Sequence, residues 1–217
     1  MRELLWAPFP TQTRVVSAAA LYLHGGSVRS QRPVTRTAMT FQRARWLRDA
    51  NAPWLAESGI ASALLRFNVR GWNAEGREPT PLADARWALE KVRLELDVPV
   101  VLVGHSMGAR TGLRVAGHPG VVGLVALAPW FPADENVDTL QGRHLAVIHG
   151  ARDRITSPYE SSIVAERAKS VTASTSYLAL PRLGHYLLSG AVTWNNATRS
   201  AIKRIAEDGQ EPETRRR

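Results

Sequence analysis

A serine flanked by two glycines is the part of this sequence best suited to chemistry. Residues 98–110 contain an apolar run, then Gly104-His105-Ser106-Met107-Gly108, then small residues typical of a buried helix. A serine at such a junction lies on a sharp, strained turn between strand and helix, with its hydroxyl lifted clear of the sheet. The turn crowds positions 104 and 108, which explains the glycine at both. The pattern predicts that Ser106 is a nucleophile.

A serine hydroxyl is a weak nucleophile unless a histidine accepts its proton and a carboxylate fixes the tautomer of that histidine. Asp153 and His185 each follow an apolar run further along the chain. Because parallel strands end at one edge of a sheet, we expect Ser106, Asp153 and His185 to meet there as a catalytic triad. Asp134 and Glu135, which follow the preceding apolar run, remain alternative acids.

An oxyanion needs hydrogen-bond donors as well as a nucleophile. Met107 supplies one backbone N–H at the start of its helix, where amide groups are unpaired and the helix dipole favours negative charge. The second donor should come from the loop His24-Gly25-Gly26-Ser27, whose glycines allow the backbone to approach a substrate carbonyl. We expect the Gly26 N–H to be this donor, with Ser27 as the neighbouring option.

The elements that must position these groups follow from the apolar pattern. Near-continuous apolar runs predict strands that are buried on both faces, and helical segments alternate with them. The expected strands are residues 15–23, 60–67, 98–103, 121–128, 145–149 and 175–180. The expected helices are residues 37–57, 81–96, 107–116, 158–171 and 194–208. This alternation predicts an α/β fold in three layers, a mostly parallel sheet of six to seven strands with helices on both faces.

Three helix boundaries carry specific signals. Thr80 before Pro81 is typical of an N-cap followed by a first-turn proline. The segment Ser157-Pro158-Tyr159-Glu160 has the pattern of a capping box. Gly209 is expected as the C′ residue that ends the last helix.

Composition limits the class of protein. A chain of 217 residues forms one domain, which we expect over residues 1–209, with a disordered basic tail at 210–217. The absence of cysteine excludes a disulfide framework and a thiolate metal site. The net charge of +9 comes from arginines scattered along the chain, so a nucleic-acid partner is not favoured. A signal-peptide core and a membrane-spanning run are both lacking, so we expect a cytoplasmic protein with no membrane partner.

Taken together, these motifs resemble the α/β-hydrolase family over residues 15–207. The likeness rests on motifs that occur in family order, namely His24-Gly25-Gly26, the Arg66–Gly71 segment, Gly104–Gly108, His149–Asp153 and Gly184-His185. It implies a Ser-His-Asp hydrolase that uses no metal or organic cofactor. Only about fourteen residues separate the strand ending near Trp130 from the one starting near Leu145. The resemblance is therefore to a compact member without a lid.

The expected activity is hydrolysis of a small-molecule carboxylic ester through an acyl-enzyme intermediate. His185 would act as the base, so activity should fall on acidification. The same residues fit a thioesterase, another acyl hydrolase or a lactonase. A non-catalytic binding protein built on the same fold is the alternative from another class. The sequence leaves the oligomeric state and the natural substrate open.

Several side chains are candidates for contact with substrate. Ser27 and His105 adjoin the expected donors and nucleophile, and His105 could equally be scaffolding for the turn. Trp72 and Trp130 follow strand ends, where they would line an apolar pocket or cap the core. Arg70 would steady its loop by ion pairing or steer an acidic substrate.

The remaining histidines have simpler interpretations. We expect His24 to support its loop by hydrogen bonding rather than to transfer protons. His118, His144 and His149 are interpreted as ordinary structural or surface residues.

Overall fold

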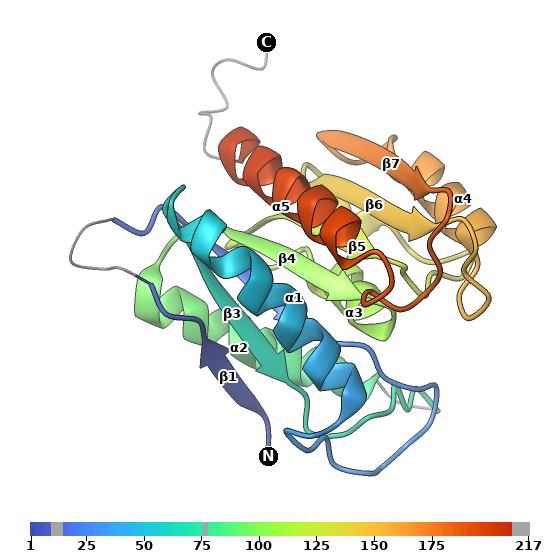
Figure 1. Ribbon diagram of the computed structural model, residues 1–217, viewed down its shortest axis with the longest axis horizontal. Helices are drawn as coiled ribbons and strands as arrows, with labels where there is room; N and C mark the ends of the chain where they lie inside the picture. Colours follow the sequence, from blue (N-terminus) through green and yellow to red (C-terminus); the bar gives the residue numbers. More distant parts are fainter. Residues whose placement is uncertain (10–14, 76–77, 210–217) are drawn as a thin grey trace.

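A seven-stranded sheet forms the centre of the molecule in the computed structural model, which describes residues 1–9, 15–75 and 78–209. The strands are β1 (Glu3–Trp6), β2 (Ala18–Leu23), β3 (Ile60–Arg66), β4 (Val100–His105), β5 (Val121–Leu127), β6 (His144–Gly150) and β7 (Ser174–Leu180). They lie in the order β1-β3-β2-β4-β5-β6-β7 (Figure 1). Only β1 pairs antiparallel, at the edge beside β3, and the remaining pairs are parallel. The predicted mostly parallel sheet is confirmed.

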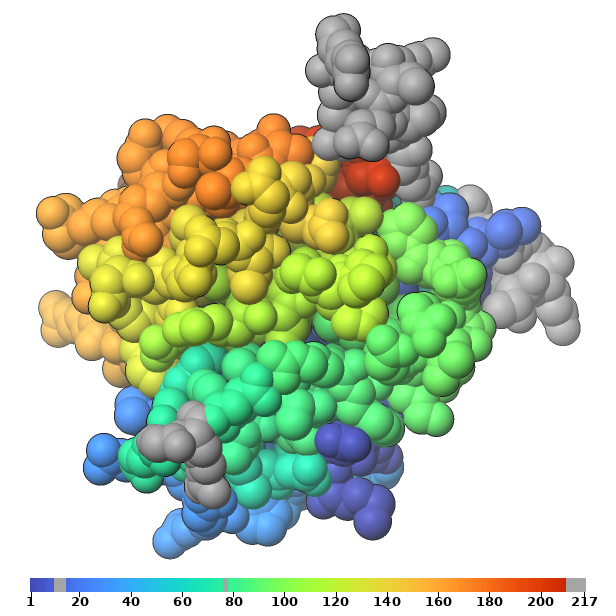
Figure 2. Space-filling model, turned by 180° about the vertical axis from the view of Figure 1, so that it is seen from behind, coloured from blue at the N-terminus to red at the C-terminus, as the bar shows by residue number. Residues whose placement is uncertain are grey.

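Helices cover both faces of this sheet. They are α1 (Met39–Ala56), α2 (Thr80–Leu96), α3 (Met107–Val115), α4 (Pro158–Ala168) and α5 (Ala191–Asp208). Helices α1 and α5 pack against each other on one face, in front of the sheet in Figure 1. Helices α2 and α3 pack against each other on the opposite face, and Figure 2 shows this side in green. The three-layer prediction is therefore confirmed.

At two of the three predicted helix boundaries the signal residue has another role in the structure. Ser157 caps α4 as predicted, because its Oγ accepts a hydrogen bond from the Glu160 N–H at 3.1 Å. Thr80 is the first helical residue rather than the N-cap, and its hydroxyl donates to Gly71 O at 2.8 Å. The last helix ends at Asp208, as predicted, but Gly209 is its C-cap, with a right-handed φ of −74°, rather than the predicted C′ residue. A Cβ there would lie 2.7 Å from Val122 Cβ, so the glycine serves close packing instead.

The parallel strands bring their carboxyl ends to one edge of the sheet. The loops after β2, β4, β6 and β7 all leave from this edge, as the alternation of strands and helices requires. Between β5 and β6 the chain forms only a short 3₁₀ turn at Asp138–Leu140, so no lid is inserted there. The predicted tail at residues 210–217 lies outside the described residues.

Candidate active site

Ser106 occupies a strained turn between β4 and α3. Its φ is 56° and its ψ is −117°, a conformation that side-chain-bearing residues rarely adopt. The turn is held in place because the Ser106 N–H donates to Leu127 O at 3.1 Å. Among the described residues, the Ser106 hydroxyl makes no hydrogen bond and is not sealed from solvent. A strained serine with a free hydroxyl is the arrangement that the glycine pattern predicts.

The flanking glycines are required by contact with neighbouring backbone. A Cβ on Gly104 would lie 2.5 Å from the backbone nitrogen of Ala109. A Cβ on Gly108 would overlap the carbonyl oxygen of Leu23, at the end of β2. The predicted crowding at positions 104 and 108 is therefore confirmed, and Gly108 sets how closely α3 approaches β2.

We expect Gly108→Ala to destabilise the protein by at least about 1–3 kcal/mol, because the methyl group must displace fixed backbone. Urea unfolding followed by circular dichroism measures this change. Gly117→Ala is the matched control, since a Cβ there would lie 3.7 Å from its nearest neighbour, Thr139 O. An equal loss of stability in the two variants would contradict this account.

Asp153 and His185 meet at the carboxyl edge of the sheet. His185 Nδ1 lies 2.8 Å from Asp153 Oδ2, and the Asp153 side chain is completely buried. The loop after β6 that carries Asp153 is tied down by its other oxygen, which accepts from the N–H groups of Ile155 and Thr156 at 2.7 and 3.0 Å. Thr156 Oγ1 also donates to Asp153 Oδ2 at 2.9 Å. The carboxylate is thus fixed in one orientation toward His185.

Hydrogen bonds have a larger effect than burial on the pKa of the Asp153 carboxyl. Burial on its own raises the pKa of this carboxyl. The bonds from His149 and His185, together with the backbone N–H groups of Thr156 and Ile155, outweigh burial and hold the pKa well below its usual range. Asp153 is therefore a carboxylate at neutral pH, as an acceptor for an imidazole N–H must be.

His149 makes a contact that the sequence interpretation missed. It is completely buried at the end of β6, and its Nε2 lies 3.1 Å from Asp153 Oδ2. Its Nδ1 lies 2.7 Å from Ser161 Oγ of α4. Of the two interpretations of His149, the structural one is confirmed and the surface one is wrong. The sequence did not indicate that the same carboxylate oxygen contacts both His149 and His185. The position of His149 four residues before Asp153, on the buried end of a strand, is the signal that could have indicated this contact.

The alternative acids lie in other surroundings. Glu135 is buried and forms ion pairs with Arg110 and Arg114 of α3, while Asp134 is exposed. Their positions after β5 are as the sequence indicates, but the carboxylate that contacts His185 is Asp153. The alternative assignment of the acid to Asp134 or Glu135 has no supporting contact among the described residues.

The loop after β2 brings Gly26 against Met107. A Cβ on Gly26 would lie 2.5 Å from the Met107 side chain, so no larger residue fits at this position. The Ser27 N–H donates to Arg70 O at 2.9 Å, so the proposed role of Ser27 as an alternative oxyanion donor is wrong. The N–H groups of Gly26 and Met107 make no hydrogen bond to any described residue. They remain available to a ligand.

His24 supports this loop as predicted. Its Nε2 accepts from the Phe67 N–H at 3.2 Å, so the proton of the neutral ring is on Nδ1, which donates to Gly25 O at 2.6 Å. Burial lowers the pKa of His24 to about 4, so the ring stays neutral at pH 7. This neutral form makes both hydrogen bonds at once.

His105 connects the elbow to the His185 loop. Its Nε2–H donates to the carbonyl oxygen of His185 at 3.0 Å, and the two ring centroids are 4.9 Å apart. Burial, then the proximity of His185 and Arg43, lower the pKa of His105 to about 3. Only 5% of the residue is exposed, so its placement favours scaffolding over the alternative of substrate contact.

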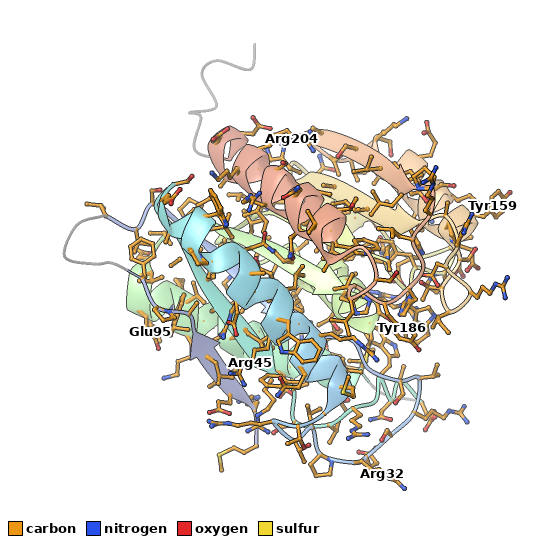
Figure 3. All side chains as sticks on the ribbon, viewed as in Figure 1. Arg32, Arg45, Glu95, Tyr159, Tyr186 and Arg204 are labelled. Carbon is orange, nitrogen blue, oxygen red and sulfur yellow. The ribbon has the colours of Figure 1, made fainter. Side chains whose placement is uncertain are left out.

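The aromatic candidates lie together beside the elbow. Trp72 and Trp130 form an edge-to-face pair with ring centroids 5.9 Å apart, and the Arg110 guanidinium lies over both rings. Trp72 is buried and Trp130 is half-buried. The backbone N–H of Trp130 donates to the backbone oxygen of Ser106 at 3.3 Å. Tyr186, next to His185, stacks against the Arg43 guanidinium at the same edge (Figure 3).

No group of three acidic, histidine or cysteine side chains in the described part of the chain is arranged to hold a metal ion. No described helix combines the length and apolar character that a membrane crossing requires.

Comparison with known proteins agrees with this fold and sequence pattern. The model of the alpha/beta hydrolase family matches residues 20–207, so the chain belongs to that family. No curated protein matches the chain in a sequence comparison.

Solved structures with similar folds include several hydrolases. The α/β serine hydrolase without a lid XC6422 from Xanthomonas campestris is 20% identical, with a TM-score of 0.69 over 94% of this chain and 88% of that one. Est1E from Butyrivibrio proteoclasticus, solved with ferulic acid bound, is 12% identical, with a TM-score of 0.66 over 94% and 95%. The esterase domain of a Rhodothermus marinus protein is 15% identical, with a TM-score of 0.63 over 95% and 98%. At these identities the likeness establishes the shared fold.

Proposed function

We propose that this protein is a serine hydrolase that cleaves carboxylic esters through an acyl-enzyme intermediate. The observation that carries the proposal is the 2.8 Å contact between His185 Nδ1 and Asp153 Oδ2 beside the strained turn of Ser106. The contact leaves Nε2 of His185 as the basic nitrogen, because Nδ1 carries the proton that bonds the carboxylate. Family membership and the esterases among the structural neighbours support ester cleavage.

Acylation begins with proton transfer from Ser106 to His185 Nε2 as the serine oxygen attacks the ester carbonyl carbon. The carbonyl oxygen becomes an oxyanion, and the N–H groups of Gly26 and Met107 donate hydrogen bonds to it. Collapse of this tetrahedral intermediate breaks the bond to the leaving alcohol, which takes its proton from His185. Asp153 keeps the imidazole in one orientation and stabilises its positive charge while the proton is held.

Deacylation repeats these steps with water. His185 removes a proton from a water molecule that attacks the acyl carbon, and the Gly26 and Met107 N–H groups again hold the oxyanion. The carboxylic acid leaves and the proton returns to Ser106. In this structure Ser106 Oγ is not hydrogen-bonded to His185. Catalytic hydrogen bonds of this kind often tighten only when substrate binds.

Reaction with a fluorophosphonate probe tests the proposal directly. We expect the folded protein to form a covalent adduct at Ser106, which mass spectrometry of the digested protein locates. Ser200→Ala, which removes an exposed serine of α5, is the control and should be labelled to the same extent. Labelled protein should also lose its hydrolysis of short p-nitrophenyl esters. Absence of an adduct at Ser106 in correctly folded protein would contradict the proposal.

His149 is expected to act as a positioning residue through Asp153. We expect His149→Leu to lower kcat for p-nitrophenyl esters by about 10–100-fold, since a hydrogen bond to a charged group contributes about 1.5–3 kcal/mol. His149→Gln should recover most of this loss, because a glutamine Nε2 can donate to Asp153 from the same side. Steady-state kinetics measures the change in kcat, and a thermal melt of each variant measures any change in the stability of the fold. Equal kcat in the Leu and Gln variants would indicate a purely structural role.

A further inference from the structure

An open cavity of about 610 Å³ adjoins the oxyanion loop. Gly26 forms part of its wall, and Arg29, Arg32 and Arg70 are among the residues that line it. We refer to it as the arginine cavity. Gly26, the expected oxyanion donor, is thus a wall residue that the cavity shares with the candidate active site.

The arginine cavity is lined by positive charge only. Its lining contains three arginines and no acidic residue. Arg29 pairs with Glu75, and both side chains are largely exposed, so solvent weakens this pair. Arg32 and Arg70 make no ion pair with a described residue. Arg32 lies at the outer edge of the loop before α1 (Figure 3) and is one of the lining residues.

Arg70 carries a buried polar group without a partner. Its Nε is inaccessible to solvent and makes no hydrogen bond among the described residues. The backbone is fixed on both sides, because the Arg70 N–H donates to Arg32 O at 3.0 Å and Arg70 O accepts from Ser27 at 2.9 Å. An unpaired buried donor is unfavourable, and a charged one more so. Arg70 also has no charge partner among the described residues, and an anion in the cavity would supply one.

The N-terminus of α1 also favours negative charge in the arginine cavity. Ala38, Met39 and Thr40 line the cavity, and they are the N-cap and the first two residues of this 18-residue helix. No side chain caps the helix there, and its first turn contains no acidic residue. The N-terminal N–H groups and the helix dipole therefore favour negative charge on the same side as Arg70.

We propose that the arginine cavity binds an anionic group, a carboxylate or a phosphate, that belongs to the ester substrate. The inference rests on the proposed esterase function and narrows it to esters with a negatively charged substituent. Guanidinium groups bind carboxylate and phosphate through paired N–H donors, so either anion fits a site lined by arginines. The anion anchors one end of the substrate while Gly26 and Met107 hold the carbonyl oxygen.

A pair of matched esters tests the preference. p-Nitrophenyl hydrogen adipate and p-nitrophenyl hexanoate have the same chain length and differ in the terminal carboxylate. We expect kcat/KM to be at least about tenfold higher for the charged ester, as for one charge-assisted contact. Arg70→Gln and Arg32→Gln should each lower the ratio of the two kcat/KM values. Arg204→Gln removes the same charge from α5, far from Arg32 in Figure 3, and should leave the ratio unchanged.

A binding measurement separates this inference from the esterase proposal. Calorimetric titration of the wild-type protein with monomethyl phosphate, and of Ser106→Ala with monomethyl adipate, needs no turnover. Binding that disappears in the double variant Arg32→Gln, Arg70→Gln supports the cavity even if no ester is cleaved, and the ligand that binds identifies the anion. Binding of neither ligand, or hydrolysis without a preference for the charged ester, overturns the inference and leaves the esterase proposal intact.

Discussion

Ser106→Ala is expected to lower kcat for short p-nitrophenyl esters by about 10⁴–10⁶-fold, because the acyl-enzyme route loses its nucleophile. The φ of 56° at this position is also unfavourable for alanine, yet the substitution removes a single oxygen that makes no hydrogen bond among the described residues. The fold should therefore be retained. Initial rates over a range of substrate concentrations, with purified protein of each variant, measure the effect.

Two controls make this result specific. The thermal midpoint of Ser106→Ala should stay within a few degrees of the wild type, and Ser200→Ala should keep the wild-type rate. A Ser106→Ala protein that is fully folded and hydrolyses these esters within tenfold of the wild type would exclude Ser106 as the nucleophile.

Asp153→Asn is expected to lower kcat by about 10⁴-fold, since the imidazole would be held in the wrong tautomer. The new amide N–H₂ would face His185 Nδ1, where Oδ2 now accepts at 2.8 Å. To accept from this amide, the ring must move its proton to Nε2, which can then no longer take a proton from serine. The amide oxygen can still accept from the Ile155 and Thr156 N–H groups, so the loop should keep its shape.

Asp134→Asn is the matched control for this prediction. Asp134 is exposed after β5 and was the alternative acid by sequence, so neutralising it should change kcat by less than about twofold. A large loss in Asp134→Asn with a small one in Asp153→Asn would reverse the assignment of the acid. Rates measured at one pH in the same buffer are sufficient to compare the two.

The sequence predicted the parts of the site that depend on strand ends and backbone space. Gly104 and Gly108 indicate the sharp turn because only a residue without a Cβ fits against the backbone of α3 and β2. The order of strands then places Asp153 and His185 at the edge where Ser106 lies. These inferences need the direction of each strand but no knowledge of how side chains pack.

What the sequence did not predict depends on contacts between distant elements. His149 lies at the end of β6 and contacts Asp153 in the loop that follows, but its other ring nitrogen contacts Ser161 in α4, which no local pattern indicates. The arginine cavity also combines distant elements, because Arg70 follows β3 whereas Arg29 and Arg32 lie in the loop after β2. The pair Thr80-Pro81 predicts a cap from local preference, whereas in the structure the Thr80 hydroxyl donates to Gly71 O, a contact that only the tertiary fold supplies.

The short connection between β5 and β6, with only the turn at Asp138–Leu140, has a consequence for how substrates arrive. A hydrolase whose entrance is covered by a mobile helical flap must open before each turnover, and oil–water boundaries often promote that opening. With no flap in this connection, the rate of hydrolysis should depend on the concentration of dissolved ester. It should show no sudden increase at the concentration where the ester forms droplets.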